Sequence, residues 1–557
     1  MSVQVGDENR DGGMFVNLDD DPELEYVAQA RDTVYALNPD GSAVAGWPIV
    51  DADRNISGVV VGDLAGGAPA WGDVDGDGEE EIVVTTFFFG IRSFLRVIEK
   101  DGSLNPAFSF QIGATGRGPS LANLDSDPAL EILVNESFSN PTSGDITIYD
   151  NNGFFFGNFP IALDDLDQFT PPGAPNPPES PFGATPSVGD IDDDGQPEIV
   201  TTSRYGIYAF ETDGSLVPGF PFDIRTIEPG TPNGPKREMG SFAAVSLADL
   251  DGNGDLELIF PVGIFQDASN IPFPPPLVHV INHDGTPFPG NWPFAVMNPV
   301  VDGSIGESTN LNRPVSVADI DLDGSYDIVF GDATLSPNPV NQIYALETDG
   351  TIKPGFPIND TPAQNPMMMI ANLDADPELE IIGWDNAAAF PNMVYNHDGT
   401  QDPAWIFDNI LDNPATFDFD GAGTPTIGDY DLDGTLDVMW VTNNLTGNPL
   451  TATEFPRFAR VTNFWLFSGT NAFNDQSAPV RTYGYNNQRT FEAVPLALIG
   501  PVCLVDFNTD GFVNSDDVDD FTAVLGSGDP VTDLNDDGSF DAVDLALFFD
   551  LLRFGCD

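Results

Sequence analysis

The sequence predicts an all-β protein, folded as a β-propeller and followed by a small all-α calcium-binding module. Three observations lead to this prediction: an acidic loop that occurs eight times, short β-type runs around every loop, and a change of pattern after residue 500. Repeats of about 40–60 residues with four short strands each are typical of propeller blades, which pack around a common axis. Eight loops predict eight four-stranded blades, with seven blades as the alternative.

The repeated loop is a ten-residue acidic stretch, represented by DVDGDGEEEI at residues 73–82. Its copies begin at positions 17, 73, 123, 190, 249, 319, 372 and 429, so they are 50 to 70 residues apart. A short apolar stretch precedes each copy, and a β-rich run such as EIVVTT follows it. A second run leads into an Asp-Gly turn, a strong hairpin signal because glycine adopts positive φ. A last run with an aromatic–proline pair, such as AGWPI, completes four strands.

The two kinds of turn predict that the propeller has one acidic face. In an up-and-down blade, the loop between strands one and two and the loop between strands three and four share a face. The opposite face then collects the variable connections, at residues 162–183, 223–241, 262–276, 296–313 and 442–460. Variable loops on a rigid scaffold often bind ligands, so we expect a glycan or a matrix protein there. The alternative is that these proline-rich insertions are tolerated spacers.

Side-chain oxygens at positions 1, 3, 5 and 9 of an acidic loop can converge on one point. Ca²⁺ suits this pattern, because it takes six to eight oxygen ligands in flexible geometry, whereas Mg²⁺ requires a stricter octahedron. Glycine at position 6 allows the sharp bend. The loops with that glycine supply the predicted ligands Asp73, Asp75, Asp77, Glu81, Asp190, Asp192, Asp194, Glu198, Asp249, Asp251, Asn253, Glu257, Asp319, Asp321, Asp323, Asp327, Asp429, Asp431, Asp433 and Asp437.

Three loops differ from the others in two positions at once. They begin with asparagine and have proline (Pro22, Pro128 and Pro377) where glycine is expected. Proline fixes φ near −65°, so these loops must bend differently, and they carry one charge less. We expect weaker or no Ca²⁺ binding at their positions Asn17, Asp19, Asp21, Glu25, Asn123, Asp125, Asp127, Glu131, Asn372, Asp374, Asp376 and Glu380. The alternative for every loop is a solvated acidic hairpin, but eight copies in register favour metal binding.

Charge excludes several classes of partner. The chain has 18 Lys and Arg against 89 Asp and Glu, a net charge of −71. Nucleic acid and anionic membranes are therefore not expected as partners, since both need basic surface. No apolar stretch reaches the roughly 20 residues that span a bilayer. The first residues, MSVQVGDENRDGG, do not resemble a signal peptide. Either the export signal was removed, as we expect for a secreted protein, or the protein is not exported by that route.

The stretch FGATPSVGDIDDDG at residues 182–195 resembles the FG-GAP/VCBS repeats of the integrin-α type. Phe-Gly is followed there by a short strand and then by the acidic loop. The resemblance covers roughly residues 14–490 and implies a Ca²⁺-stabilised propeller. The family includes adhesion heads, lectins and some polysaccharide lyases, so the motif is informative about the fold and not about the ligand.

A different motif occupies the last residues of the chain. Two twelve-residue loops, DFNTDGFVNSDD and DLNDDGSFDAVD, have EF-hand spacing, and sequences with helical periodicity follow them. Their predicted ligands are Asp506, Asn508, Asp510, Asn514, Asp517, Asp533, Asn535, Asp537, Asp541 and Asp544. Two such units with no helix before the first loop resemble a dockerin, which implies a cohesin-like or cell-surface protein as partner. The expected organisation is a leader at 1–13, the propeller at 14–492, a linker at 493–502 and the dockerin-like domain at 503–557.

The two cysteines, Cys503 and Cys556, lie at the two ends of this module. A disulfide between them would join its termini, stabilise it by about 4 kcal/mol in the chain-entropy model, and place the protein in an oxidising extracellular setting. The alternative is a pair of unrelated thiols.

No HExxH, GxSxG, P-loop or paired-cysteine zinc motif is present, and the chain has only three histidines. Two of them, His283 and His397, precede Asp-Gly turns at equivalent repeat positions, so repetition explains them better than catalysis. We therefore expect a secreted, non-enzymatic adhesion or interaction protein. The alternatives are a propeller lectin and a polysaccharide lyase or related sugar-active enzyme. A lyase would depend on the few cations of the variable face, Lys236, Arg237, Arg313, Arg457 and Arg460.

Overall fold

The computed structural model describes most of the chain between residues 2 and 493. The described ranges are 2–5, 12–50 except 20, 31 and 32, 55–56, 59–60, 64–65, 67–88, 92–113, 118–140, 143–166, 184–224 except 204 and 205, 239–240, 243–264, 276–296, 313–331, 341–361, 367–383 except 375, 394–402, 424–446, 459–472, 478, 485–486 and 488–493. The predicted linker from residue 494 on, the dockerin-like module and both cysteines lie outside these ranges.

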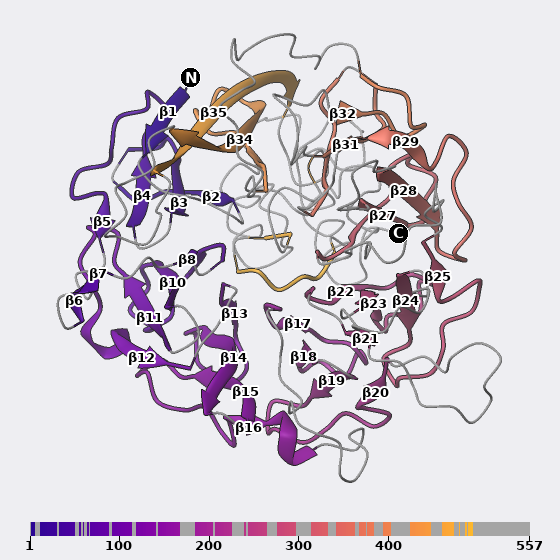
Figure 1. Cartoon of the computed structure of the whole chain (residues 1–557), viewed down its shortest axis with the longest axis horizontal. Helices are drawn as coiled ribbons and strands as arrows, with labels where there is room; N and C mark the ends of the chain where they lie inside the picture. The colour runs from indigo at the N-terminus through magenta and orange to yellow at the C-terminus, as the bar shows by residue number, and fades with distance from the viewer. Residues whose placement is uncertain are drawn as a thin grey trace, which may run out of the picture.

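The described strands form antiparallel sheets arranged around a common axis, as Figure 1 shows. We number these units by the acidic loop that each contains. Seven units are complete blades of four or five strands, and unit 7 is a sheet of three described strands. The predicted all-β propeller is therefore confirmed. The described strands fit the seven-bladed alternative, with seven complete blades, instead of the eight four-stranded blades expected first, and the remaining unit has three described strands.

Units 1 to 4 follow one another along the chain. Unit 1 comprises β2 (Gly13–Val16), β3 (Glu25–Ala30), β4 (Thr33–Leu37) and β5 (Ile49–Val50). A separate pair, β6 (Asn55–Ile56) and β7 (Val59–Val60), precedes unit 2. Unit 2 comprises β8 (Leu64–Ala65), β9 (Ala70–Gly72), β10 (Glu81–Phe88), β11 (Arg92–Ile98) and β12 (Phe110–Ile112). Unit 3 comprises β13 (Ser120–Ala122), β14 (Glu131–Asn140), β15 (Ser143–Tyr149) and β16 (Ile161–Ala162). Unit 4 comprises β17 (Ser187–Gly189), β18 (Glu198–Thr202), β19 (Gly206–Phe210) and β20 (Phe222–Asp223).

The remaining units repeat the same order. Unit 5 comprises β21 (Met239–Gly240), β22 (Ser246–Ala248), β23 (Glu257–Ile264), β24 (Leu277–Ile281) and β25 (Phe294–Ala295). Unit 6 comprises β26 (Ser316–Ala318), β27 (Asp327–Gly331), β28 (Asn341–Glu347) and β29 (Ile358–Thr361). Unit 7 comprises β30 (Met369–Ala371), β31 (Glu380–Ile382) and β32 (Val394–Tyr395). Unit 8 comprises β33 (Thr426–Gly428), β34 (Thr435–Thr446), β35 (Ala459–Ala472) and β1 (Ser2–Val5). Two short 3-10 helices, η2 (Pro106–Phe108) and η3 (Leu163–Leu166), complete the described elements.

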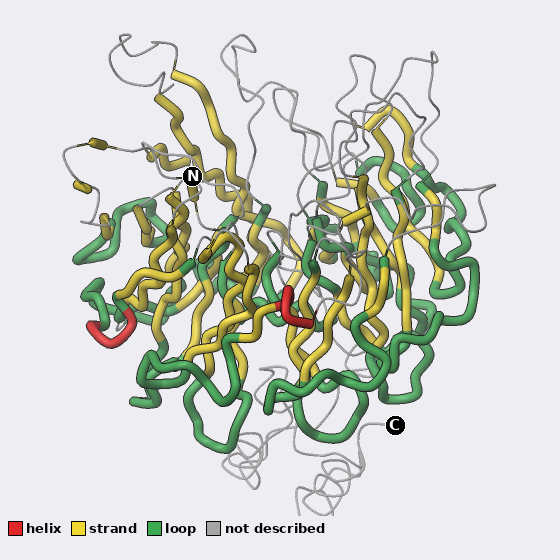
Figure 2. The backbone as a smooth tube through the Cα atoms, turned by 60° about the horizontal axis from the view of Figure 1, so that its bottom comes forward, coloured by secondary structure: helices red, strands yellow, loops and turns green. Residues whose placement is uncertain are grey.

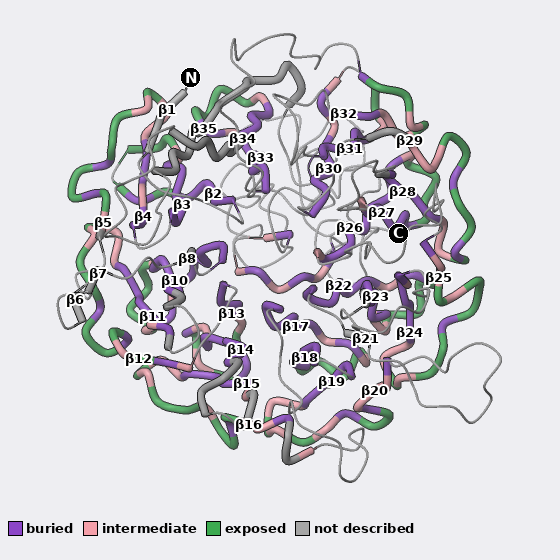
Figure 3. The backbone as a smooth tube through the Cα atoms, viewed as in Figure 1, coloured by how far each residue is buried: buried purple, intermediate pink, exposed green. Residues whose placement is uncertain are grey.

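The core lies between the sheets. Strands such as β18 and β19 are buried at every position, because neighbouring sheets cover both of their faces. This explains why their sequences, EIVTT and GIYAF, are almost continuously β-branched, apolar or aromatic instead of alternating. Figure 3 shows buried residues along the strands and exposed residues mainly in the outer connections.

The ring is closed by the two ends of the propeller sequence. β1 pairs with β35, so residues 2–5, which the sequence analysis assigned to a leader, form the outer strand of unit 8. Between units 8 and 1, Thr426 Oγ1 donates to Gly13 O at 3.0 Å and Tyr430 stacks on Phe15 with ring centroids 4.7 Å apart. The first and last units are thus joined by hydrogen bonds and by an aromatic contact.

A segment near the end of the described chain crosses the middle of the ring. Figure 1 draws residues 485–486 and 488–493 in yellow between the innermost strands. The carbonyls of Gln488, Thr490 and Phe491 accept backbone hydrogen bonds from β13, β17 and β22 of units 3, 4 and 5, at 2.8–2.9 Å. Arg489, which is 1% exposed, donates to Pro69 O at 3.0 Å and to Gly13 O at 3.3 Å, in units 2 and 1. We call residues 485–493 the axial segment.

Candidate metal sites on the acidic face

Every acidic loop connects a three- or four-residue inner strand of its unit to the next strand along the chain, as the repeat predicts. Loop 2, for example, leaves β9 at Gly72 and enters β10 at Glu81. The turn between the third and fourth strands lies beside it, because Lys100 in that turn reaches Glu79 at 3.0 Å and Asn105 reaches Asp75 at 2.9 Å. The predicted acidic face is therefore present, and Figure 2 shows described loops and turns along the lower rim of the ring.

Position 9 is the most uniform part of the loops. Its carboxylate is at most 1% exposed in every loop, because the residue is in or next to the buried second strand. One carboxylate oxygen accepts the backbone N–H of position 2, at 2.5–3.1 Å. These acceptors are Glu25, Glu81, Glu131, Glu198, Glu257, Asp327, Glu380 and Asp437.

The second oxygen of this carboxylate has neither a hydrogen bond nor an ion pair within the described chain in three of the loops. The three atoms are the Oε1 atoms of Glu81, Glu198 and Glu380, and all are buried. A buried carboxylate oxygen without a partner is costly, since it has lost its hydration without compensation. A cation on the loop side of this carboxylate would remove that cost.

The five glycine loops share one backbone geometry. The position-1 aspartate accepts the N–H of the position-6 glycine at 2.8–3.0 Å, and that glycine has φ between 84° and 98°. Position 4 also has positive φ, at Gly76, Asp193, Gly252, Leu322 and Leu432. The sequence analysis predicted the bend at position 6 but missed the one at position 4, because aspartate or leucine at that position does not predict a positive φ.

The three proline loops use a different hydrogen bond. Proline has no N–H, so the position-6 donor that holds the aspartate in the other loops is missing. An asparagine amide at position 1 donates instead to the carbonyl of position 5, from Asn17 at 3.2 Å, Asn123 at 2.6 Å and Asn372 at 2.8 Å. Asparagine and proline therefore occur together for a structural reason, and the predicted difference in bending is explained.

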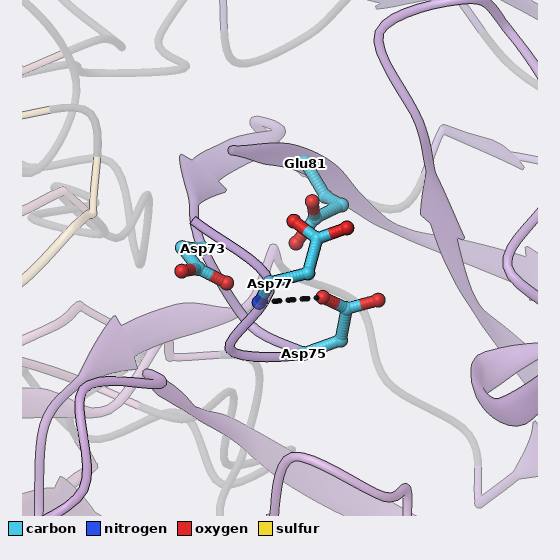
Figure 4. A group of neighbouring side chains, drawn as sticks. All are labelled: Asp73, Asp75, Asp77 and Glu81. Carbon is cyan, nitrogen blue, oxygen red and sulfur yellow. Dashed lines mark hydrogen bonds between the residues drawn. The ribbon is translucent and has the colours of Figure 1, made fainter. Parts of the chain in front are cut away.

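Carboxylate groups come together in both classes of loop. In loop 2, ligand atoms of Asp73, Asp75, Asp77 and Glu81 all lie within 4.8 Å of one another, as Figure 4 illustrates. Comparable groups of three are Asp190, Asp192 and Asp194; Asp249, Asp251 and Glu257; Asp19, Asp21 and Glu25; and Asp125, Asp127 and Glu131. Each of these clusters can bind a metal ion.

The pKa of the position-9 carboxyls is raised above its ordinary value. Burial is the main cause, a hydrogen bond from position 2 opposes it, and the neighbouring aspartates add to it. The pKa rises to about 7 in Glu25 and Glu131, and to about 8 in Glu81, Glu198, Glu257 and Glu380. Without a counter-charge, these carboxyls hold a proton near neutral pH; a divalent cation would take the place of that proton.

The residues fit calcium better than a transition metal. All the donors of loop 2 are carboxylate oxygens, and no histidine or cysteine belongs to the cluster. A set of hard oxygen donors on a short flexible loop is the donor set of Ca²⁺. In this site, Asp73, Asp75, Asp77 and Glu81 would hold the ion.

Two side chains that reach the loops were missed in the sequence. Asn105 and Lys353 both follow the turn glycine by three residues, Asn105 touching Asp75 and Lys353 touching Asp321 at 2.9 Å and Asp327 at 2.7 Å. Aligning the repeats at their turns would have exposed this position. It was overlooked because only the acidic loops were compared.

Two of the histidines have different surroundings. His279 is buried and stacks on Phe260 with 5.2 Å between ring centroids, and burial lowers its pKa to about 4. His283 Nδ1 lies 3.1 Å from Asp255 in loop 5. On the opposite face, Lys236, Arg237, Arg457 and most of the variable connections lie outside the described residues.

No helix among the described residues is long and apolar enough to cross a membrane. Comparison with protein families and with curated proteins finds no match. Among solved structures, the chain is similar to the rhamnogalacturonan lyase YesW, with a TM-score of 0.43 and 12% identity over 88% of this chain and 96% of that one. It is also similar to the C-terminal domain of Pseudomonas aeruginosa PilY1, with a TM-score of 0.42 and 13% identity over 75% and 90%. For the V. cholerae biofilm matrix protein Bap1 the values are 0.36 and 16% over 74% and 68%.

Proposed function

We propose that this chain is a calcium-stabilised propeller of the FG-GAP/VCBS type that serves as an extracellular binding protein, not as an enzyme. The observation that supports the proposal is the environment of the position-9 carboxylate. It is buried in all eight loops, and one of its oxygens accepts a backbone hydrogen bond. In three loops the other oxygen has no partner within the described chain. The same feature in loop after loop indicates a role in stabilising the ring. Extracellular modules commonly bind Ca²⁺ at millimolar concentrations, which suits loops this exposed.

Calcium titration of the metal-stripped full chain tests the first part. Glu81→Gln should remove one calcium site, because it neutralises the buried ligand of loop 2. Glu79→Gln is the matched control, since Glu79 is exposed in the same loop and lies outside the acidic cluster. We expect more than two ions per wild-type chain, because the two C-terminal loops account for two at most. Two ions or fewer would overturn the proposal.

The binding role belongs to the face opposite the acidic loops, where the variable connections attach. Its expected ligand is a glycan or a matrix protein, and the C-terminal module would join the protein to a cohesin-like or cell-surface partner. Incubation with pectin-type polysaccharides separates the alternatives. Retention on the polymer without a rise in ultraviolet absorbance supports a binding protein, whereas a rise from newly formed unsaturated ends would make the chain a lyase.

A further inference from the structure

Lys353 follows the turn after β28, and its side chain reaches the acidic loop of unit 6. Its side chain is 4% exposed, and Nζ is 2.7 Å from Asp327 Oδ1, 2.9 Å from Asp321 Oδ2 and 3.5 Å from Glu347 Oε1. Asp321 and Asp327 occupy positions 3 and 9 of the loop. The ammonium group therefore joins two of the carboxylates that the repeat reserves for a metal ion.

The oxygen that Lys353 binds is the one that other loops leave available. Asp327 Oδ2 accepts the N–H of Ile320 at 3.1 Å, just as Glu81 Oε2 accepts the N–H of Val74 at 2.9 Å. Neither the other oxygen of Glu81 nor that of Asp327 has a hydrogen-bond partner in the described chain, but the oxygen of Asp327 forms an ion pair with Nζ at 2.7 Å. The lysine thus brings to the carboxylates of unit 6 a positive charge, whereas the lysine beside loop 2, Lys100, pairs with Glu79 and Glu80 outside the cluster.

The position of Lys353 is the same in seven units, which makes the comparison direct. In each, the residue three after the turn glycine donates its backbone N–H to the third strand, at 2.9–3.5 Å. The seven residues are Val44, Asn105, Phe156, Val217, Phe288, Lys353 and Asp402. Only unit 6 has a cation there, and its partners in the loop are ligand positions.

We propose that Lys353 is a built-in cation that replaces the metal ion in unit 6, so that this unit closes without calcium. The inference rests on the proposed function, since it assumes that the other glycine loops bind calcium. A lysine ammonium and Ca²⁺ could not share Asp321 and Asp327, because like charges a few Å apart repel strongly in a buried site. The expectation of a calcium site at Asp319, Asp321, Asp323 and Asp327 is replaced accordingly.

The charge state of Lys353 agrees with this role. Burial acts to lower its pKa, but hydrogen bonds and charge from Asp327 and Asp321 outweigh burial and raise it. The ammonium is therefore protonated at neutral pH. Unlike a bound ion, it cannot be removed by a chelator.

A reciprocal exchange between units 2 and 6 tests the proposal in the full chain. Lys353→Asn gives unit 6 the residue of unit 2, and Asn105→Lys does the reverse. Bound calcium per chain, measured by equilibrium dialysis and elemental analysis, should rise by one ion in the first variant and fall by one in the second. Lys100→Asn is the control, because Lys100 contacts only Glu79 and Glu80 in loop 2, which lie outside the cluster, and should leave the count unchanged.

Melting temperatures in excess chelator give a second readout. Lys353→Asn should melt below the wild type there and recover with calcium, and Asn105→Lys should melt above it. Unchanged calcium counts in both variants would overturn the proposal, and Asn105→Lys decides alone if Lys353→Asn does not fold. A wild type that binds no more than two ions would instead refute the proposed function, while the two shifts in chelator would still test whether Lys353 compensates the charge of loop 6.

Discussion

The acidic loops join strands within single units, whereas the axial segment binds several units at once, and the two regions also differ in charge and in repetition. Acidic loops 1 to 5 each gather three or four carboxylates, so the same arrangement recurs along the acidic face. The axial segment occurs once, and in the middle of it the guanidinium of Arg489 donates to carbonyls of units 1 and 2. The comparison indicates two independent supports: a face that needs cations, and an axis that supplies its own donors.

Removal of calcium should have the largest effect, because it acts on the repeated element. One site saturated at a hundredfold excess over its dissociation constant stabilises a protein by about 2.7 kcal/mol, and several sites act together. We expect the melting temperature of the full chain to fall markedly in excess EDTA, measured by calorimetry, and to recover with Ca²⁺ but not with equimolar Mg²⁺. An unchanged melting temperature would mean that the loops are only solvated turns.

Arg489→Met should have the next largest effect, and it should not depend on calcium. The change keeps an apolar stem but removes the donors to Pro69 O, Gly13 O and Asn486 O. Loss of hydrogen bonds from a buried charged group should lower the free energy of unfolding by about 3 kcal/mol. Urea denaturation in saturating calcium measures it.

Lys100→Met is the matched control for this substitution, because it removes a cation that is partly exposed at the rim. It should change stability by less than about 1 kcal/mol. Equal losses in the two variants would show that the axial segment has no special role.

The two supports were not equally predictable from sequence. The acidic loops could be assigned because glycine, proline and aspartate recur at fixed positions, and each has a defined backbone consequence. The axial segment has no periodicity, and Tyr485, Arg489 and Phe491 adopt positive φ that no local signal announces. The proposed role of Lys353 is intermediate in predictability, because it can be recognised from the sequence only when the turns of all units are compared.

The pH dependence of stability should separate the two supports further. In the metal-free protein, the pKa of Glu81 and Glu198 is raised to about 8, above the value in the unfolded chain. A raised carboxyl pKa means that the folded state holds the proton more tightly, so stability is highest in acid and falls as pH rises through about 8. We expect the melting temperature of the metal-free protein to decline as the pH rises from the ordinary carboxyl pKa to about 8.

Saturating calcium should reverse this trend, because protons and the ion compete for the same carboxylates. Arg489 does not titrate in this range, so Arg489→Met should shift both pH curves downward without changing their slopes. A metal-free protein that becomes more stable with rising pH would contradict the assignment of these buried carboxyls.

Converting a proline loop into a glycine loop should have a smaller, local effect. Asn123→Asp together with Pro128→Gly restores both the acidic ligand and the N–H that holds it in the other loops. We expect one additional calcium ion or a tighter site in unit 3, measured by titration calorimetry. Asn123→Asp alone is the control, because Pro128 still offers no N–H, and an equal gain from it would show that charge matters and geometry does not.

The smallest effect concerns a leucine in a backbone conformation that suits glycine. Leu432 has φ of 52° at position 4 of loop 8 and is 47% exposed, so its side chain buries little surface in return. Leu432→Gly should raise the free energy of unfolding by up to about 1 kcal/mol, since a left-handed residue with a Cβ costs about 1–2 kcal/mol. Leu104, also exposed but without positive φ, is the control, and Leu104→Gly should lower stability instead. If both substitutions lower it equally, position 4 stores no strain, and the second bend of the glycine loops is as favourable for leucine as for glycine.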